Sequence, residues 1–399
     1  MLSSLSQFSF HFETTGKPMT ILLFIILYYA KIINYYCFVF YNRLEFIMIF
    51  FLLLFLLITL KSINICTNEN HFNTNYLSIE NTNVIKGIFV ILVIFSHSSQ
   101  YITLDSVYDN PYSSFMKFMG QMIVSVFLFY SGYGIMESLK KKKFSYIKTI
   151  PTKRFLKVLI NFDIAVLLYL VLNLILGTHY DIKTTILSFI GWENIGNSNW
   201  YILAVLVLYI LTFISFFPMK WWNDSKSLYI YAAFFTILSI GFVYFEMKMG
   251  KQSYYYNTII LYALGIWYSL LKKYIENITL KNDVIYSAIS ALLLLLLYLS
   301  YNNRSSFGIE SYSLWAVCFT ITLILFSMKI SFNNTILSWF GTHIFSVYIL
   351  QRIPMMILHY FGVTQNHKYF FIVLSIIATI CLAHIFDNLT GKMWKRIAS

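Results

Sequence analysis

Charge is scarce in this sequence: Asp, Glu, Lys and Arg make up 11% of its 399 residues, against 59% that are hydrophobic. A soluble domain cannot cover that much apolar surface, because the outside of a chain folded in water needs polar groups. The four cysteines are scattered without a CxxC pair, which argues against a disulfide framework and a structural zinc site, and we expect no metal. A Walker A sequence is also missing, which argues against ATP hydrolysis.

Apolar runs long enough to cross a bilayer fill most of the chain instead. We predict an all-α fold, a polytopic transmembrane bundle with ten core helices and one or two extra N-terminal helices. The predicted core spans are 84–104, 115–137, 155–177, 199–217, 228–246, 254–271, 284–301, 311–328, 336–361 and 370–388. We divide the chain into an N-terminal hydrophobic part (1–75, with apolar segments 20–41 and 44–60 and alternative translation starts at Met19 and Met48), a ten-helix domain (76–390) and a basic tail (391–399).

The cations predict the orientation of the bundle. The formal net charge is +13, and the Lys and Arg residues lie in short loops between the apolar runs. If span 84–104 begins inside, the inner loops hold about seventeen of them and the outer loops five. We therefore expect a multi-pass protein of the inner or plasma membrane, with both core termini cytoplasmic. In this interpretation the cations set topology and contact lipid headgroups, and nucleic acid is not a partner.

Lys86 and His97 stand out in the first core span. Eleven residues separate them, which places both side chains on one helix face, roughly 16 Å apart along the axis. Ionisable groups inside a bilayer are costly and line functional paths by default. We predict that His97 is a general base. The alternative is a core histidine hydrogen-bonded to a neighbouring helix.

A phosphate-binding mouth is predicted beside Lys86. Arg154 and Lys157 are three residues apart on the first turn of a span, where both can face the bundle. Three cations at one membrane edge suit a polyanionic ligand. The preceding run, 140–143, is explained by topology alone.

Further polar and aromatic residues are candidates for an acceptor pocket, and each has a structural alternative. Ser131 can line a narrow path or only allow close helix packing, and Trp200 can stack on a sugar or anchor the membrane interface. Arg352 can bind substrate or pair with a buried acid, and Asp105 or Asp109 in the first outer loop can orient His97. The full set of pocket candidates is Ser131, Tyr133, Asp105, Trp200, Tyr348 and Arg352.

Five segments resemble motifs of the acyltransferase-3 family of integral membrane acyltransferases. The stretch from Lys86 to His97 resembles its Arg/Lys-x10-His motif, and Arg154-Phe-Leu-Lys157 is similar to its Arg-x-x-Arg motif. The other three are Phe129-Tyr-Ser-Gly-Tyr133, Asn199-Trp-Tyr-Ile202 and the segment from Trp339 to Leu350. In the family's order, the resemblance covers about residues 76–390. Lys157 departs from the motif by lacking the planar guanidinium, and Gln351 stands where many members carry histidine.

The resemblance implies transfer of an acyl group, usually acetyl, from cytoplasmic acyl-CoA to a hydroxyl of a surface polysaccharide, lipid-linked glycan or peptidoglycan. Acetyl-CoA is then the expected co-substrate. Lys86, Arg154 and Lys157 would hold its phosphates while the thioester reaches His97. Direct transfer and a covalent acyl-histidine both remain open. The alternative function is a transporter or flippase for a glycan, since such proteins also bury Arg and His along a path.

Overall fold

The computed structural model describes residues 48–66, 72–105, 107–224, 226–280, 282–306 and 308–398. The predicted apolar segment 20–41 lies outside these residues. The helices are α2 (Met48–Lys61), α3 (Ile79–Ser98), α4 (Asn110–Met119), α5 (Met122–Lys142), α6 (Phe144–Ile147), α7 (Lys157–Ile175), α8 (Ile182–Phe189), α9 (Trp200–Phe216), α10 (Ser227–Lys248), α11 (Ile260–Thr279), α12 (Asp283–Asn302), α13 (Ile309–Ser327), α14 (Thr335–Thr342), α15 (Ile344–Leu350), α16 (Arg352–Tyr360), α17 (Val363–Asn366) and α18 (Lys368–Ala398). Short 3₁₀ turns are η1 (Val107–Asp109), η3 (Phe217–Lys220) and η4 (Ser253–Tyr255), η2 (Ile150–Leu156) is a π-helix, and β1 (Ile63–Ile65) and β2 (Ile330–Phe332) are strands.

The predicted all-α membrane bundle is confirmed. Among the described residues, eight helices are long and apolar enough to cross a membrane. They are Ile79–Ser98, Asn110–Lys142, Ile150–Ile175, Trp200–Lys220, Ser227–Lys248, Asp283–Asn302, Ile309–Ser327 and Lys368–Ile397. A helix satisfies its backbone hydrogen bonds internally, which is what a lipid environment requires. The protein is therefore a multi-pass membrane protein.

Two of the ten predicted spans look different in the structure. The span 254–271 corresponds to α11, a full helix that carries Lys272, Lys273 and Glu276 and is therefore more polar than the other eight. The span 336–361 is not one rod but three consecutive helices, α14, α15 and α16. The breaks fall at His343 and at Gln351.

Two close helix crossings are built on glycines. A Cβ atom on Gly87 of α3 would collide with the backbone carbonyl of Leu337 in α14, and one on Gly341 of α14 would collide with the carbonyl of Asn83. The crossing of α5 and α11 repeats this reciprocal arrangement with Gly132 and Gly265. Small residues let helix backbones approach closely in membranes. Both α3 and α5 are thus fixed against a neighbour at backbone contact.

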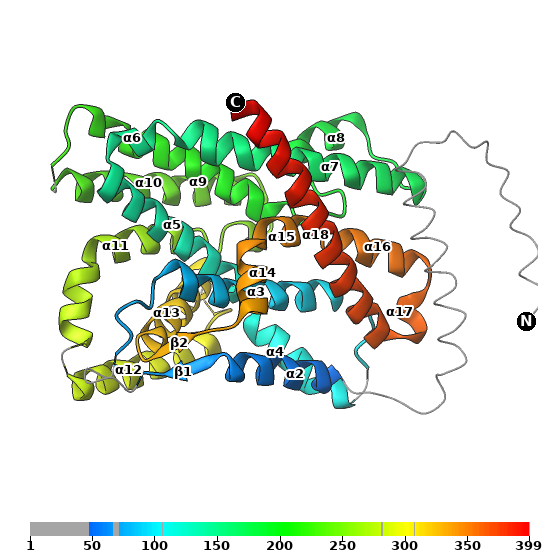
Figure 1. Ribbon diagram of the computed structural model, residues 1–399, viewed down its shortest axis with the longest axis horizontal. Helices are drawn as coiled ribbons and strands as arrows, with labels where there is room; N and C mark the ends of the chain where they lie inside the picture. Colours follow the sequence, from blue (N-terminus) through cyan, green and yellow to red (C-terminus); the bar gives the residue numbers. More distant parts are fainter. Residues whose placement is uncertain are drawn as a thin grey trace, which may run out of the picture.

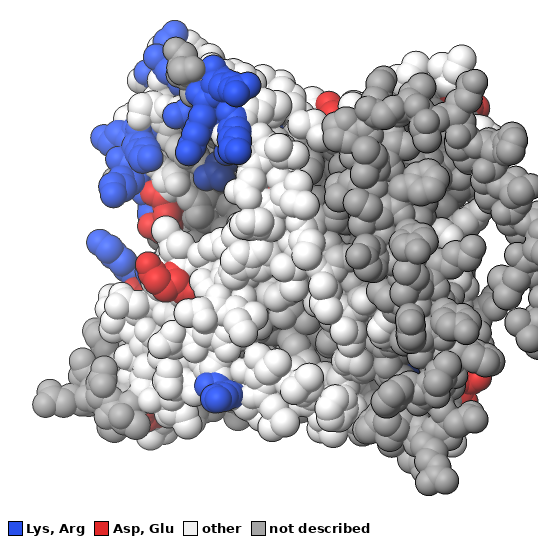
Figure 2. Space-filling model, turned by 45° about the vertical axis from the view of Figure 1, so that its right-hand side comes forward, with Lys and Arg blue, Asp and Glu red and all other residues white. Residues whose placement is uncertain are grey.

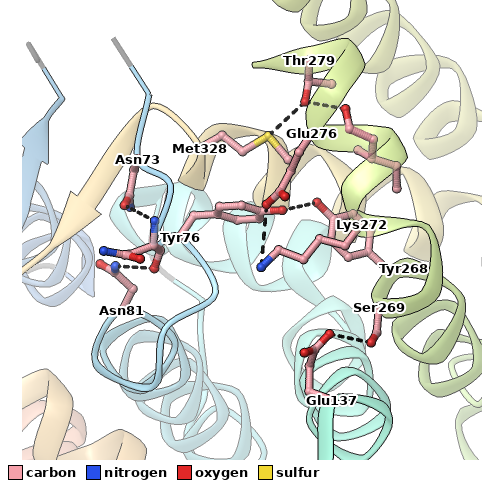
Figure 3. Close-up of polar contacts among 12 residues, drawn as sticks. Asn73, Tyr76, Asn81, Glu137, Tyr268, Ser269, Lys272, Glu276, Thr279 and Met328 are labelled. Carbon is pink, nitrogen blue, oxygen red and sulfur yellow. Dashed lines mark hydrogen bonds and ion pairs between the residues drawn. The ribbon is translucent and has the colours of Figure 1, made fainter. Parts of the chain in front are cut away.

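The start of α3 is anchored from two sides. Strands β1 and β2 pair antiparallel, with Ile63 opposite Phe332, and the Phe332 N–H donates to the side chain of Asn81 at 2.9 Å. On the other side, the Tyr76 hydroxyl lies 2.9 Å from that of Tyr268 in α11, as Figure 3 shows. Burial raises the pKa of Tyr76, so this hydroxyl stays neutral. The side chain of Ser78 caps the helix by accepting from the backbone of Asn81.

Helix α3 lies in the middle of the bundle, with α14 across it and α5 beside it (Figure 1). We call the end of the bundle where α3 begins the Lys86 end, and the end where it stops the His97 end. Lysine and arginine side chains gather in one corner of the face in Figure 2, next to a few carboxylates. Most of the remaining described surface in this view is uncharged. This uneven charge is typical of a chain whose middle is surrounded by lipid.

Candidate functional site

Lys86 and His97 both lie on α3, as the sequence predicts, about three helical turns apart. Both side chains are half-buried, in a helix most of whose other residues are buried. Lys86 forms no ion pair with any of the described residues, unlike Lys140 and Lys272, which each pair with a glutamate. The helix therefore carries one unpaired ammonium at its beginning and one imidazole at its end.

Ser198 lies next to His97, and Arg352 contacts Ser198. The Nδ1 atom of His97 lies 3.5 Å from the Ser198 hydroxyl. That hydroxyl accepts a hydrogen bond from Arg352 Nε at 3.2 Å, and Arg352 Nη2 donates to the side-chain oxygen of Gln100 at 2.7 Å. Arg352 is the first residue of α16, so the break at Gln351 is what turns its side chain toward α3. The predicted pocket residue Arg352 thus reaches His97 through Ser198.

The loop that carries Ser198 is held in place by its neighbours. Asn199 donates from Nδ2 to the Gly191 carbonyl at 2.7 Å and to the Tyr255 hydroxyl at 3.2 Å. Lys251 donates from Nζ to the Trp192 carbonyl at 2.6 Å and lies over the Trp192 ring. Burial lowers the pKa of Lys251. The loop is therefore fixed at both ends, which fixes Ser198 relative to His97.

A cavity of about 220 Å³ opens next to His97. Residues of α3 and the turn after it, the α4–α5 turn, α5, α9, η4, α13 and α15 line it, namely Val93, Ser96, His97, Gln100, Gly120, Gln121, Ile123, Val124, Trp200, Tyr254, Tyr312 and Tyr348. Two of the predicted pocket residues, Trp200 and Tyr348, belong to this set. The cavity thus brings an imidazole together with aromatic rings and amide side chains.

A series of tyrosines connects Arg154 with His97. Arg154 lies in the π-helix η2, donates from Nε to the Tyr146 hydroxyl at 3.1 Å and also interacts electrostatically with Tyr209. Tyr209 lies on α9, eight residues after Tyr201, so about 12 Å of helix rise separates the two. The rings of Tyr201 and Tyr348 are 5.3 Å apart, and those of Tyr348 and His97 are 6.4 Å apart. We call these four residues (146, 209, 201 and 348) the tyrosine series.

Two more predicted residues border the tyrosine series or its entrance. Ser131 of α5 interacts with Tyr201. Lys157, the first residue of α7, interacts electrostatically with Asp387 of α18. The carboxylate of Asp387 accepts a hydrogen bond from Ser346 at 2.8 Å and lies 3.8 Å from the His343 ring. Lys157 therefore shares Asp387 as a partner with His343.

Tyr133 and Asp105 lie away from His97. Tyr133 contacts Tyr268 and the Lys272 ammonium, on the side of α5 that faces α11, beside a second cavity of about 520 Å³ at the Lys86 end. Asp105 is exposed and lies 3.9 Å from Lys368, whose ammonium also donates to Asp109 at 2.6 Å. Neither residue lines the cavity beside His97, and the pocket role of each stays a prediction. The side chain next to His97 Nδ1 is that of Ser198.

The described residues contain no group of three or more His, Cys, Asp or Glu side chains able to hold a metal ion.

Comparison with known proteins decides the family. The sequence model of the acyltransferase-3 family, described as an acyltransferase domain, matches residues 79–386, well over half of the chain. The chain belongs to the acyltransferase-3 family. The match begins at the first residue of α3 and ends within α18, so it covers the whole bundle described above. No curated protein and no solved structure matches the chain significantly.

Several residues around His97 in this acyltransferase were not singled out from the sequence. Ser198, Gln100, Gln121 and Tyr254 lie in loops or at helix ends, where no hydrophobic periodicity marks a side chain as facing inward. Ser198 stands two residues before Trp200, so closeness to the Asn199-Trp-Tyr-Ile202 motif was the one signal available. Tyr209 was hidden among the 32 tyrosines of the chain, whereas Tyr201 belongs to that motif.

Proposed function

We propose that the protein transfers an acyl group, most simply acetyl, from cytoplasmic acyl-CoA to a hydroxyl of a cell-surface or lipid-linked glycan. Membership of the acyltransferase-3 family supports acyl transfer as the reaction. The observation that carries the route is the tyrosine series, because it leads from Arg154 at the Lys86 end to the His97 cavity. In this proposal the Lys86 end faces the cytoplasm and the His97 end faces outward.

Donor binding uses the cations at the Lys86 end. Lys86 and Arg154 contact the phosphates of coenzyme A, with Lys157 beside them, because phosphate oxygens accept charge-assisted hydrogen bonds. The thin pantetheine arm then follows the tyrosine series toward His97. The roughly 16 Å rise between Lys86 and His97 is similar to the length of that arm.

Transfer takes place at His97. Its Nδ1 atom faces Ser198, and the Gln351 side chain also interacts with the ring. In this proposal Nε2 meets the acceptor. Nε2 takes the proton of the acceptor hydroxyl, and the oxygen attacks the thioester carbonyl. A carbon–oxygen bond forms, the carbon–sulfur bond breaks, and the leaving thiolate recovers the proton from the imidazolium. Acyl group, proton and electron pairs then balance without a further reagent.

Acetyl-CoA binding tests the donor site. In the purified protein, Lys86→Ala and Arg154→Ala should each weaken binding about tenfold to a hundredfold, because loss of one charge-assisted phosphate contact removes about 1.5–3 kcal/mol. Isothermal titration calorimetry in detergent or nanodiscs gives the dissociation constants.

Lys183→Ala is the matched control, since Lys183 is an exposed lysine of α8 at the other end of the bundle. Equal loss in all three variants would indicate general electrostatic attraction and contradict the assigned site. Absence of binding to well-folded wild-type protein would remove the donor proposal and favour the transport alternative.

Ser198 and Arg352 are positioning residues in this mechanism. Ser198→Ala should lower kcat about fivefold to tenfold, since a lost hydrogen bond costs about 1 kcal/mol, and should shift the pH profile of kcat/KM. Steady-state rates between pH 5 and 9 measure this, together with the thermal unfolding midpoint. Ser198→Thr, which keeps the hydroxyl, should restore the profile. An unchanged pH profile with a lowered midpoint would show that Ser198 is only structural.

A further inference from the structure

Lys251 follows α10 in a turn that returns it to the end of that helix. Gly250 has a φ of +69°, and the Lys251 N–H donates to the Glu246 carbonyl at 3.1 Å. Helices commonly end in this way, because glycine adopts the left-handed conformation without strain. The turn places the Lys251 side chain next to that of Glu246, and the two interact electrostatically.

The Lys251 ammonium lies between aromatic rings of two different segments. It is 4.1 Å from the centroid of the Trp192 ring and 5.0 Å from that of the Tyr255 ring. Trp192 belongs to the loop between α8 and α9, and Tyr255 is the last residue of η4. A cation is attracted to the face of an aromatic ring, more strongly where water is excluded, and the Lys251 side chain is 12% exposed. Lys251 therefore joins the α8–α9 loop to η4.

Glu246 depends on Lys251 for its charge partner. The residue is 1% exposed, and its Oε2 atom accepts no hydrogen bond from the described residues. A buried carboxylate without compensation is costly, and the cation with which Glu246 interacts is Lys251. Glu193 lies 3.9 Å from the same ammonium, but its side chain is 42% exposed, so water screens this attraction. The buried pair with Glu246 therefore keeps the Lys251 ammonium in one position.

The α8–α9 loop needs such contacts to keep one shape. It contains Gly191 and Gly196, with φ values of +76° and +93°, and glycine loses more conformational freedom on folding than any other residue. The Lys251 ammonium donates to the Trp192 carbonyl, directly after the first of these glycines, at 2.6 Å. Ser198 comes two residues after the second glycine. The contact with Lys251 therefore holds the same loop that carries the serine beside the imidazole.

We propose that Lys251 is a positioning residue, which holds the α8–α9 loop where Ser198 meets His97. The inference rests on the proposed function, in which His97 accepts the proton of the acceptor hydroxyl. Lys251 does not line the cavity beside His97, so it acts through the loop. Loss of its ammonium frees the Trp192 carbonyl and releases the serine from the imidazole, which then loses the neighbour that orients its ring.

Lys251→Met tests this role, because methionine keeps an unbranched side chain and removes the ammonium. The substitution should lower kcat for transfer from acetyl-CoA to glycerol about fivefold to tenfold, the effect expected of Ser198→Ala, since both remove the same hydrogen bond. The pH profile of kcat/KM should shift as it does in Ser198→Ala, and acetyl-CoA affinity should stay within about twofold. Lys251→Arg keeps the charge and the contact with the rings and should restore the wild-type profile.

A double-substitution cycle distinguishes positioning from a purely structural role. If Lys251 acts through Ser198, Lys251→Met should lower kcat by less than about twofold when Ser198→Ala is already present. An equal fall in both backgrounds, or a lower thermal midpoint with an unchanged pH profile, would overturn the inference. Lys248→Met is the matched control, because Lys248 is an exposed lysine at the end of the same helix, and it should leave kcat unchanged.

A second variant covers the case in which Lys251→Met does not fold. Combining Lys251→Met with Glu246→Gln removes both charges, so that no unpaired carboxylate is left in the interior. The Trp192 carbonyl still lacks its donor, and kcat should fall as in the single variant. A wild-type kcat in this folded double variant would contradict the positioning role.

The two levels of proposal fail differently. Wild-type transfer to glycerol, combined with independent effects of Lys251→Met and Ser198→Ala, overturns the positioning role alone. Absence of any thioester turnover by the wild-type protein with water or glycerol overturns the proposed function, and this inference with it.

Discussion

His97→Ala is expected to lower the rate of acyl transfer by about 10²–10⁴-fold, the usual contribution of a general base. His97 is the one histidine that lines the described cavity at the end of the tyrosine series, so no neighbouring imidazole can take over its proton. Donor binding should stay within about twofold, because the phosphates are held at the Lys86 end. Transfer to glycerol, followed by release of free thiol, measures the rate, and titration with acetyl-CoA measures binding.

His179→Ala is the matched control, because His179 is exposed in the α7–α8 loop. It should retain wild-type transfer. His97→Gln keeps a hydrogen-bonding side chain without a base of suitable pKa and should be as inactive as His97→Ala. Retention of a tenth or more of the wild-type rate in both His97 variants would show that another group accepts the proton.

Gly132→Ala is expected to destabilise the bundle strongly. A Cβ atom at Gly132 would overlap the backbone carbonyl of Tyr262 in α11, and Gly265 makes the reciprocal contact with the carbonyl of Phe129 in α5. Neither backbone can move without separating the two helices, and overpacking of this kind costs typically about 1–3 kcal/mol, occasionally more. Thermal unfolding in one detergent should show a midpoint several degrees lower than that of wild type.

Gly134 provides a control in the same helix. A Cβ atom there meets no heavy atom within 4 Å. Gly134→Ala should therefore leave stability unchanged or raise it by about 0.5–1 kcal/mol, because alanine favours a helix over glycine. Equal midpoints for the Gly132 and Gly134 variants would contradict the close approach of α5 and α11.

Hydropathy was enough to predict most of the architecture. The lipid requires apolar runs of about twenty residues, so eight of the predicted spans coincide with long apolar helices. Helical periodicity was enough to place Lys86 and His97 on one helix, because both lie inside a single uninterrupted run. These features depend on local sequence alone.

The remaining features depend on contacts between distant segments. The breaks at His343 and Gln351 have no Gly or Pro at the break itself, and the three helices they separate are mostly apolar, so hydropathy joins α14, α15 and α16 into one span. Ser198 meets His97 across 101 residues of sequence, and Arg352 meets Ser198 across 154. Such pairings are set by the packing of α9 and α16 on α3, which no spacing in the sequence encodes.

The interruption of α14, α15 and α16 also bears on the order in which the protein assembles. A broken helix leaves carbonyl groups without intrahelical donors, and the Ile349 carbonyl receives its hydrogen bond from the Tyr169 hydroxyl of α7, 180 residues away in sequence. In lipid, such a group has no water to replace that donor. The turn that carries Tyr348, Gln351 and Arg352 can therefore take its shape only after α7 has been inserted and has docked. The His97 cavity is therefore completed only when this turn packs on α7.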